Sequence, residues 1–175
     1  LLVAAKDDIT HRGLAEQFAR HDIERAYKAL VWGVPAKNSG TISDNIGRSP
    51  RNRKKMAVVR RGGKTAMTHF QVLRRFANLA ALVECRLETG RTHQIRVHMS
   101  SIGHPIVGDQ VYGGGIRRCP ASVNTSLHQS LQILEGQLLH AFLLGLSHPI
   151  MHKKMRFISK KSLKINNLTE KLECE

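Results

Sequence analysis

Cysteine is scarce in this chain, which has three cysteines among 175 residues. Cys85, Cys119 and Cys174 are odd in number and show no CxxC spacing, which argues against a disulfide framework and favours a reducing compartment, so we expect a cytoplasmic protein. Cys85 lies in the alternating run 81–87 and is expected to pack in the core. The ten histidines match no metal-ligand spacing, so we expect no metal site.

Long hydrophobic runs are also missing. No stretch reaches the roughly 18 apolar residues that a membrane-spanning helix needs. Residues 1–6 have no basic lead and no long apolar core, so they do not resemble a secretory signal. The length and the apolar content of 41 % are typical of one globular domain. We therefore expect residues 1–175 to form a single catalytic-type domain that ends in a polar tail, 162–175.

Acidic residues are few relative to basic ones, with 13 Asp and Glu against 28 Lys and Arg and a formal charge of +15. Such an excess repels itself, which favours a polyanionic partner. A membrane surface is the competing partner, but no long amphipathic helix is visible. The charge is densest between residues 48 and 64, which could be only a solvated loop; its density favours an arm that holds phosphates. The expected contacts are Arg48, Arg51, Arg53, Lys54, Lys55, Arg60 and Arg61.

Periodicity predicts an α+β fold with a mainly antiparallel sheet. Alternating or apolar runs predict strands at 24–33, 41–46, 65–76, 79–88, 138–148 and 153–160. Helices are expected at about 10–20 with Thr10 as the cap, at 127–134 and within the tail. Residues 1–5 read as a buried strand, from which we expect that a preceding portion is missing and that the unpaired edge promotes self-association.

The stretch 87–98 combines the end of a strand, a glycine turn and a helix start with Thr92 as the expected cap. Arg91, His93, Gln94 and Arg96 crowd this junction. Backbone N–H groups at a helix start favour anions, and two arginines suit a phosphate or a carboxylate. The alternative is a solvated basic turn. Five glycines within 102–115 predict a shaped loop beside such a site.

Five blocks, in the same order, resemble the RluA family of RNA pseudouridine synthases, and the similarity covers about residues 1 to 150. The blocks are Arg25-Ala26-Tyr27-Lys28-Ala29-Leu30-Val31-Trp32-Gly33, Gly63-Lys64-Thr65-Ala66-Met67-Thr68, Gly90-Arg91-Thr92-His93-Gln94-Ile95-Arg96-Val97-His98, Gly103-His104-Pro105-Ile106-Val107-Gly108-Asp109 with Tyr112-Gly113, and Leu139-His140-Ala141 before His148-Pro149. The segment 48–58 also resembles the branch that modifies large-subunit ribosomal RNA.

The resemblance implies a mixed, mainly antiparallel sheet with peripheral helices around a central basic cleft. It implies isomerisation of uridine to pseudouridine in ribosomal RNA by a full-length monomer, with no cofactor. Tyr27 matches the active-site tyrosine, which stacks on the flipped uracil and has been proposed as a general base; its alternative is a tyrosine packed in the core. Arg96 matches the residue that pairs with the catalytic carboxylate, and Leu139 matches a residue that lines the uracil pocket. Arg91, His93 and Gln94 are expected to contact the substrate.

The sequence departs from the family at the nucleophile. The family's aspartate lies in a His-Arg-Leu-Asp segment before a strand like residues 1–6, and neither Asp7 nor Asp8 fits this motif. Asp109 matches a structural Gly-Asp loop. We therefore expect the catalytic aspartate to be absent from these residues, Arg96 to face solvent or phosphate, and the 175-residue chain to bind RNA without turnover. The alternative is a non-catalytic RNA-binding remnant.

Overall fold

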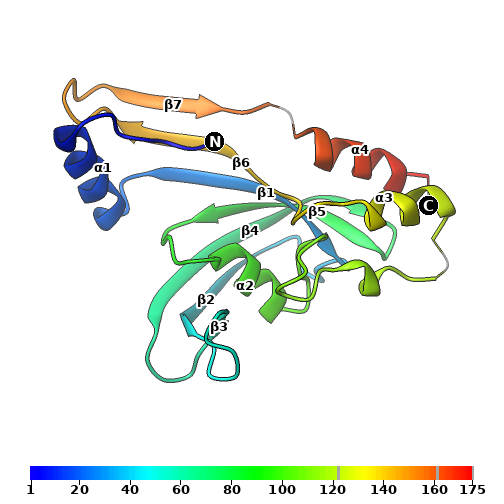
Figure 1. Ribbon diagram of the computed structural model, residues 1–175. Helices are drawn as coiled ribbons and strands as arrows, with labels where there is room; N and C mark the ends of the chain where they lie inside the picture. Colours follow the sequence, from blue (N-terminus) through cyan, green and yellow to red (C-terminus); the bar gives the residue numbers. More distant parts are fainter. Residues whose placement is uncertain (122, 161, 175) are drawn as a thin grey trace.

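The computed structural model describes residues 1–121, 123–160 and 162–174. Its centre is a seven-stranded sheet in the order β3-β2-β4-β5-β1-β6-β7 (Figure 1). The strands are β1 (Glu24–Trp32), β2 (Ser39–Arg48), β3 (Met56–Val58), β4 (Lys64–Phe76), β5 (Ala80–Leu87), β6 (Leu139–Ser147) and β7 (Lys154–Ile158). Neighbouring strands pair antiparallel throughout the described sheet, so the mainly antiparallel prediction is confirmed.

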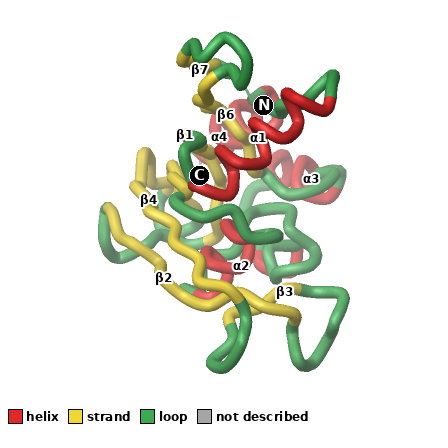
Figure 2. The backbone as a smooth tube through the Cα atoms, turned by 90° about the vertical axis from the view of Figure 1, so that its left-hand side faces the viewer, coloured by secondary structure: helices red, strands yellow, loops and turns green. Residues whose placement is uncertain are grey.

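Four helices and a short 3₁₀ turn surround the sheet. They are α1 (Asp8–Arg20), α2 (Gln94–Ser101), α3 (Thr125–Gln132), α4 (Leu163–Leu172) and the turn Ile116–Arg118 (Figure 2). Within the described ranges, none of these helices is long and apolar enough to span a membrane.

Alternation along β1 places apolar side chains on both faces of the sheet. Ala29 and Val31 pack on one face with Ile95 and Met99 of α2. Leu30 packs on the other face against α3 and α4. Successive side chains of a strand point to opposite faces, so this central strand is apolar on both sides where helices cover it. Figure 1 shows α3 beside α4 at the right-hand end of the sheet, away from α2.

The predicted core position of Cys85 is confirmed. Its side chain is fully buried in the cluster beneath α2. Burial raises the pKa of the Cys85 thiol to about 12, so the group stays neutral and behaves as a small apolar side chain.

The prediction of a buried strand at residues 1–5 is wrong. Residues 1–5 form no strand, and Leu2 is 90 % exposed. The outer edge of β6 is paired with β7 along Leu143–Ser147. Residues 1–5 contact β6 through a hydrogen bond from the Leu1 nitrogen to the Ala141 carbonyl, and Val3 and Ala5 pack against a cluster that contains Leu144 and Leu146. Self-association of the chain stays a prediction. The helix predicted within the tail is confirmed as α4, and its residues Ile165, Leu168 and Leu172 are buried in the core rather than solvated.

The first helix begins one turn earlier than predicted. Asp7, not Thr10, is the cap, because its Oδ1 accepts a hydrogen bond from the Thr10 N–H at 2.8 Å. Thr10 instead donates its hydroxyl to Asp7 Oδ2 at 2.9 Å. The two aspartates at positions 7 and 8 therefore start a helix, which explains their presence without any catalytic role.

His98 is a fully buried histidine between α2 and β4. Its Nδ1 is 2.9 Å from the Thr68 hydroxyl, and its Nε2 has no partner among the described residues. Burial lowers the pKa of His98 from 6.5, with a weaker opposing effect of Asp44. The folded protein therefore holds this imidazole neutral.

We expect His98 to make folding sensitive to mild acid. Because its pKa is lower in the folded state, the unfolded chain binds the proton first as the pH falls. The contribution of the neutral His98 side chain to the free energy of unfolding is therefore complete above about pH 6.5 and decreases as the pH falls below that value. Urea unfolding at about pH 7.5 and about pH 5.5 measures this difference. In the non-titrating variant His98→Asn the difference should shrink, and an unchanged difference would assign the effect to other histidines.

Candidate nucleic-acid interface and active site

The start of α2 is organised by the side chain of Gln94 rather than by a threonine cap. Thr92 makes no cap contact; the residue before the helix is His93, which has a left-handed backbone with φ of 58°. The Gln94 oxygen accepts from the Thr89 hydroxyl at 2.8 Å and from the Arg91 N–H at 2.9 Å. Its amide donates to the Met67 carbonyl at 2.9 Å and to the Thr68 hydroxyl at 3.0 Å. The prediction of Thr92 as the cap is therefore wrong.

Gln94 is 2 % exposed, and these four hydrogen bonds use its full capacity. A side chain that is buried and fully hydrogen-bonded is not available to contact a substrate, so the predicted substrate contact by Gln94 does not agree with the structure. Its function in the fold is to tie the 89–91 turn and the start of α2 to β4. The Arg91 side chain is also held to β4, because its Nε donates to the Thr65 carbonyl at 3.0 Å.

Arg96 forms a largely buried ion pair with Asp109. Its Nε lies 2.7 Å from Asp109 Oδ2, and its Nη2 lies 2.8 Å from Asp109 Oδ1. The side chains of Arg96 and Asp109 are 12 % and 0 % exposed. The expectation that Arg96 faces solvent or phosphate is wrong, because the glycine-rich loop folds back and brings a carboxylate to it. This bidentate geometry is the strongest form of an arginine–carboxylate pair.

The loop supports the Asp109 carboxylate from the backbone as well. Asp109 Oδ1 also accepts from the N–H groups of Val111 and Tyr112, at 3.0 and 3.1 Å. Burial acts to raise the pKa of Asp109, but the hydrogen bonds from Arg96 and from the Tyr112 backbone outweigh it, so the pKa lies below its usual 3.8. The hydrogen bond to Asp109 raises the pKa of Arg96. Both groups are therefore ionised at neutral pH.

Tyr112 connects this pair to the basic loops. Its ring lies 4.8 Å from the Arg96 guanidinium carbon, in cation–π geometry. Its hydroxyl accepts a hydrogen bond from the Met56 N–H at 3.0 Å and is 2.9 Å from His93 Nδ1. Sequence reasoning missed this role, although the spacing of Gly108, Asp109 and Tyr112 was visible. Tyr112 therefore joins β3, the start of α2 and Arg96 in one network.

Tyr27 and Leu139 lie on the sheet face that α2 covers. Both are half-buried and pack against the cluster that contains Cys85 and Ile95. Tyr27 pairs with Ala141 of β6 at a register shift between Ala26 and Tyr27. Such bulges re-aim side chains and are frequent beside active sites. The sheet therefore brings two predicted pocket residues, from β1 and β6, onto one side of the molecule.

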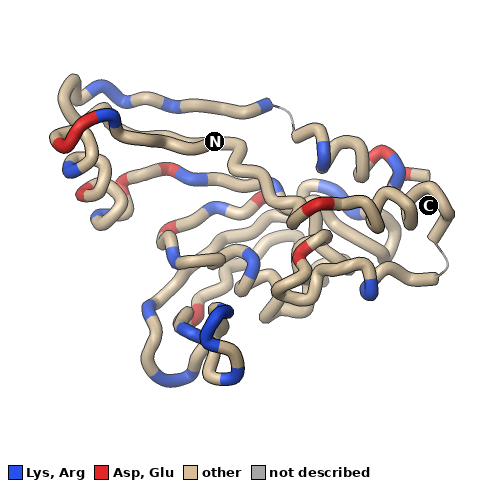
Figure 3. Tube along the Cα trace, viewed as in Figure 1, with Lys and Arg blue, Asp and Glu red and all other residues tan. Residues whose placement is uncertain are grey.

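The predicted phosphate-contacting residues lie mostly at the tips of two loops that flank β3. Figure 3 shows Lys and Arg gathered on these loops, below β2 and β3. The side chains of Arg51, Arg53 and Lys54 are exposed there, as are Arg48, Arg60 and Arg61. Lys55 differs, because its amine donates to the Val111 carbonyl at 2.9 Å and ties the loop to the Asp109 segment. The loops and the Arg96 network are therefore physically connected.

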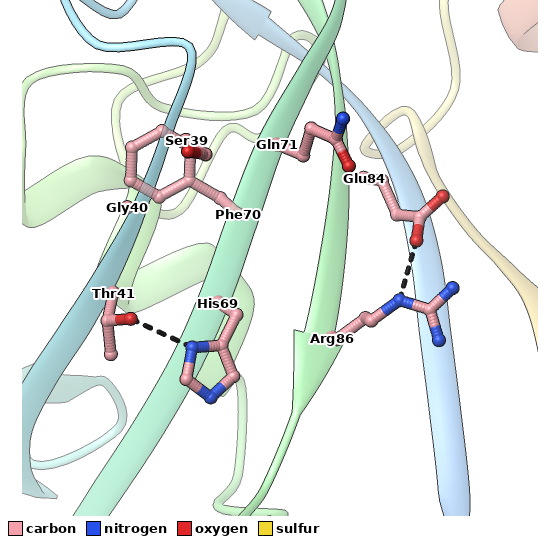
Figure 4. Close-up of a pocket in the computed structure, with 8 residues that line it drawn as sticks. All are labelled: Ser39, Gly40, Thr41, His69, Phe70, Gln71, Glu84 and Arg86. Carbon is pink, nitrogen blue, oxygen red and sulfur yellow. Dashed lines mark hydrogen bonds and ion pairs between the residues drawn. The ribbon is translucent and has the colours of Figure 1, made fainter.

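A separate polar hollow of about 320 Å³ lies on the opposite face of the sheet, and the sequence did not predict it. Glu84 and Arg86 point there, away from the side of Cys85 and Tyr27. Figure 4 shows Arg86 paired with Glu84 at 2.8 Å, and His69 Nδ1 at 2.8 Å from the Thr41 hydroxyl. Because the arginine of the hollow is already paired with a carboxylate, we do not assign the hollow to the candidate active site.

The sequence is similar to known RNA pseudouridine synthases. The sequence profile described as "RNA pseudouridylate synthase" matches residues 1–101. A protein of Zymomonas mobilis named "Ribosomal large subunit pseudouridine synthase D" is 50 % identical over 158 residues, which are 90 % of this chain and 47 % of the relative. "RNA pseudouridine synthase 2, chloroplastic" of Arabidopsis thaliana is 42 % identical over 171 residues, 90 % of this chain and 40 % of the relative. This chain thus spans less than half the length of these two relatives.

Solved structures show the same fold. "Human RNA Pseudouridylate Synthase Domain Containing 4" superposes with a TM-score of 0.71 at 26 % identity, covering 95 % of this chain and 68 % of that protein. "Human RNA Pseudouridylate Synthase Domain Containing 1" gives 0.69 at 25 % identity, covering 98 % and 74 %. The profile match covers more than half of the sequence. The chain belongs to the RNA pseudouridylate synthase family.

Proposed function

We propose that this chain forms the part of an RNA pseudouridine synthase that carries Tyr27 and Arg96, and that the enzyme acts on large-subunit ribosomal RNA. In this reaction the bond between C1′ and N1 of a uridine breaks, the uracil turns, and C5 bonds to C1′. The hydrogen on C5 leaves to solvent, and N1 takes up a proton. Substrate and product are isomers, so the reaction needs no redox partner and no cofactor.

The observation that carries this proposal is the place of Tyr27 in the sheet. Tyr27 sits at a bulge, half-buried and on the same face as Leu139. An aromatic ring and an aliphatic side chain suit the two faces of an extruded pyrimidine. We assign Tyr27 to stacking on the uracil and Leu139 to lining its pocket.

RNA binding in this proposal rests on charge. The chain carries a formal charge of +15, and most predicted phosphate contacts are exposed at the loop tips. Side chains of this kind position the RNA through its backbone without reading bases. Arg91 and His93, at the junction before α2, are the contacts we propose nearest to the Arg96 network. The names of several relatives, including "Ribosomal large subunit pseudouridine synthase D", support large-subunit ribosomal RNA as the substrate.

RNA binding without chemistry is the second candidate, and the Arg96–Asp109 pair favours it. In the proposed enzyme Arg96 orients a catalytic carboxylate. Here both carboxylate oxygens that Arg96 holds belong to Asp109, and residues 1–175 contain no His-Arg-Leu-Asp segment. An arginine already paired in this way stabilises the fold and leaves the basic loops able to bind RNA.

Release of tritium from ribosomal RNA labelled at uridine C5 distinguishes the two candidates. We expect release by the protein encoded in the complete open reading frame that contains these residues, and a loss of at least about 100-fold for its Tyr27→Phe variant. Residues 1–175 alone are expected to bind the RNA without release. If the complete protein binds the RNA but releases no tritium, binding without chemistry is the correct function. Failure of both proteins to bind would reject both candidates.

A further inference from the structure

Arg25 carries a positive charge that is not paired in the described structure. Its side chain is half-buried, and its Nε is buried without a hydrogen-bond partner among the described residues. Its guanidinium carbon lies 5.5 Å from the centre of the Phe18 ring. Burial lowers the pKa of Arg25. An aromatic contact positions a guanidinium but does not satisfy its N–H groups, so the group retains donors for an anion.

The position of the guanidinium depends on a glycine. A Cβ at position 90 would collide with Arg25 Nη1, so Gly90 leaves the space that the guanidinium fills. Gly90 does not have a positive φ, so the backbone alone does not require a glycine there. Close approach by Arg25 is the reason that the structure gives for a glycine at this position.

The carboxylates near Arg25 are engaged with other side chains. A cleft beside Arg25 also contains Asp22, Glu24 and Glu88. Asp22 pairs with Arg20 at 3.2 Å, and Glu88 pairs with His69 at 2.5 Å. Glu24 is held by Arg86 at 3.2 Å and by Arg156 at 3.0 Å. Burying a charge is costly unless it is paired, and the described protein groups leave Arg25 unpaired.

We propose that Arg25 is a substrate-binding residue that holds a phosphate of the RNA beside the uridine at Tyr27. Arg25 and Tyr27 are two residues apart on β1, so their side chains leave the same face about 6.6 Å apart. A nucleotide whose base stacks on Tyr27 can therefore bring a backbone phosphate to the guanidinium. Arginine suits this role because its fork of donors matches phosphate oxygens. This inference rests on the proposed function and adds one contact to it.

Two variants of the chain test the contact by different means. Arg25→Gln removes the charge, whereas Gly90→Ala keeps the charge and displaces the guanidinium. The matched control is Arg12→Gln, which removes one charge from an exposed position on α1. Affinity for a uridine-containing single-stranded RNA is measured against salt by fluorescence anisotropy, after far-UV circular dichroism has shown that each variant folds. The ¹H–¹⁵N signal of Arg25 Nε is followed in wild type as the same RNA, or inorganic phosphate, is added.

We expect Arg25→Gln and Gly90→Ala each to lose about tenfold or more in affinity, with Arg12→Gln close to wild type. The salt slope should fall by about 0.7 for Arg25→Gln, the value for one phosphate contact on a single strand. The Nε signal should shift with RNA. If wild type binds but Arg25→Gln and Gly90→Ala match Arg12→Gln, the Arg25 contact is wrong and the proposed function stands. If wild type binds no RNA, both the Arg25 contact and the proposed function are wrong. If Arg25→Gln fails to fold, the affinity of Gly90→Ala and the shift of the Nε signal test the Arg25 contact.

Discussion

Replacing Asp109 with asparagine is expected to lower the free energy of unfolding by about 3–5 kcal/mol. The change keeps the shape of the side chain and an oxygen for the backbone N–H groups of Val111 and Tyr112. It removes the negative charge that faces Arg96, whose side chain is 12 % exposed and has no second carboxylate within the described ion pairs. A positive charge that has lost its partner in this setting is far more costly than at the surface, where solvent screens it.

Urea unfolding of Asp109→Asn measures this loss, and Asp22→Asn is the matched control. Asp22 pairs with Arg20 through side chains that are 58 % and 66 % exposed, so the same chemical change there should cost no more than about 1 kcal/mol. In the double variant Arg96→Met with Asp109→Asn, the loss in the free energy of unfolding should be smaller than the sum of the losses in the two single variants, because neither residue then leaves a buried charge. Equal losses at positions 109 and 22 would show that the buried pair does not stabilise the loop.

The difference in the free energy of unfolding between wild type and Asp109→Asn should decrease as the pH falls. The pKa of Asp109 is lower in the folded protein than its usual 3.8, so the ionised carboxylate contributes its full stability above that value. This contribution is lost as the pH falls through the folded-state pKa. The two proteins should therefore approach each other in strongly acidic solution, at pH values below those at which His98 acts.

The sequence predicted the parts of the fold that depend on local pattern. β4 and β5 were found because alternation over many residues and a turn at Asn78 define a hairpin without help from the rest of the chain. The start of α2 was placed wrongly because its cap is not local. Gln94 makes its hydrogen bonds partly with Met67 and Thr68, about 26 residues earlier, as the sequence separations of these bonds show. A preference for threonine at helix starts contains no information about such partners.

The pairing of Arg96 with Asp109 was not predicted, for a related reason. The site residues were identified by similarity, and similarity assigned Arg96 to a carboxylate outside these residues. Asp109 lies 13 positions further on, across a loop whose path depends on left-handed glycines such as Gly108 and Gly113. Sequence can indicate that such a loop is shaped, but not where it returns. Similarly, α4 was read as polar because its buried residues Ile165, Leu168 and Leu172 are separated by solvated ones, although their spacing is helical.

Removing three charges from the basic loop, by Arg51→Gln, Arg53→Gln and Lys54→Gln together, should reduce affinity for RNA on the order of 100-fold near neutral pH and low salt. These side chains are exposed, and no described ion pair joins them to a carboxylate, so their charges are free to hold phosphates. Each lost contact to a single strand lowers the salt slope by about 0.7, so the slope should fall by about 2.

The matched control removes three exposed charges elsewhere, by Lys6→Gln, Arg117→Gln and Lys153→Gln. Both triple variants have the same net charge, so any effect of the overall field is the same in each. Anisotropy titrations at several salt concentrations should separate them, with the control close to wild type in slope. Identical losses would mean that RNA responds to net charge alone. A loss confined to the loop variant would mean that RNA contacts this loop. The loop is joined to Arg96 by the hydrogen bonds of Lys55 and of the Tyr112 hydroxyl and by the contact of the Tyr112 ring with the guanidinium.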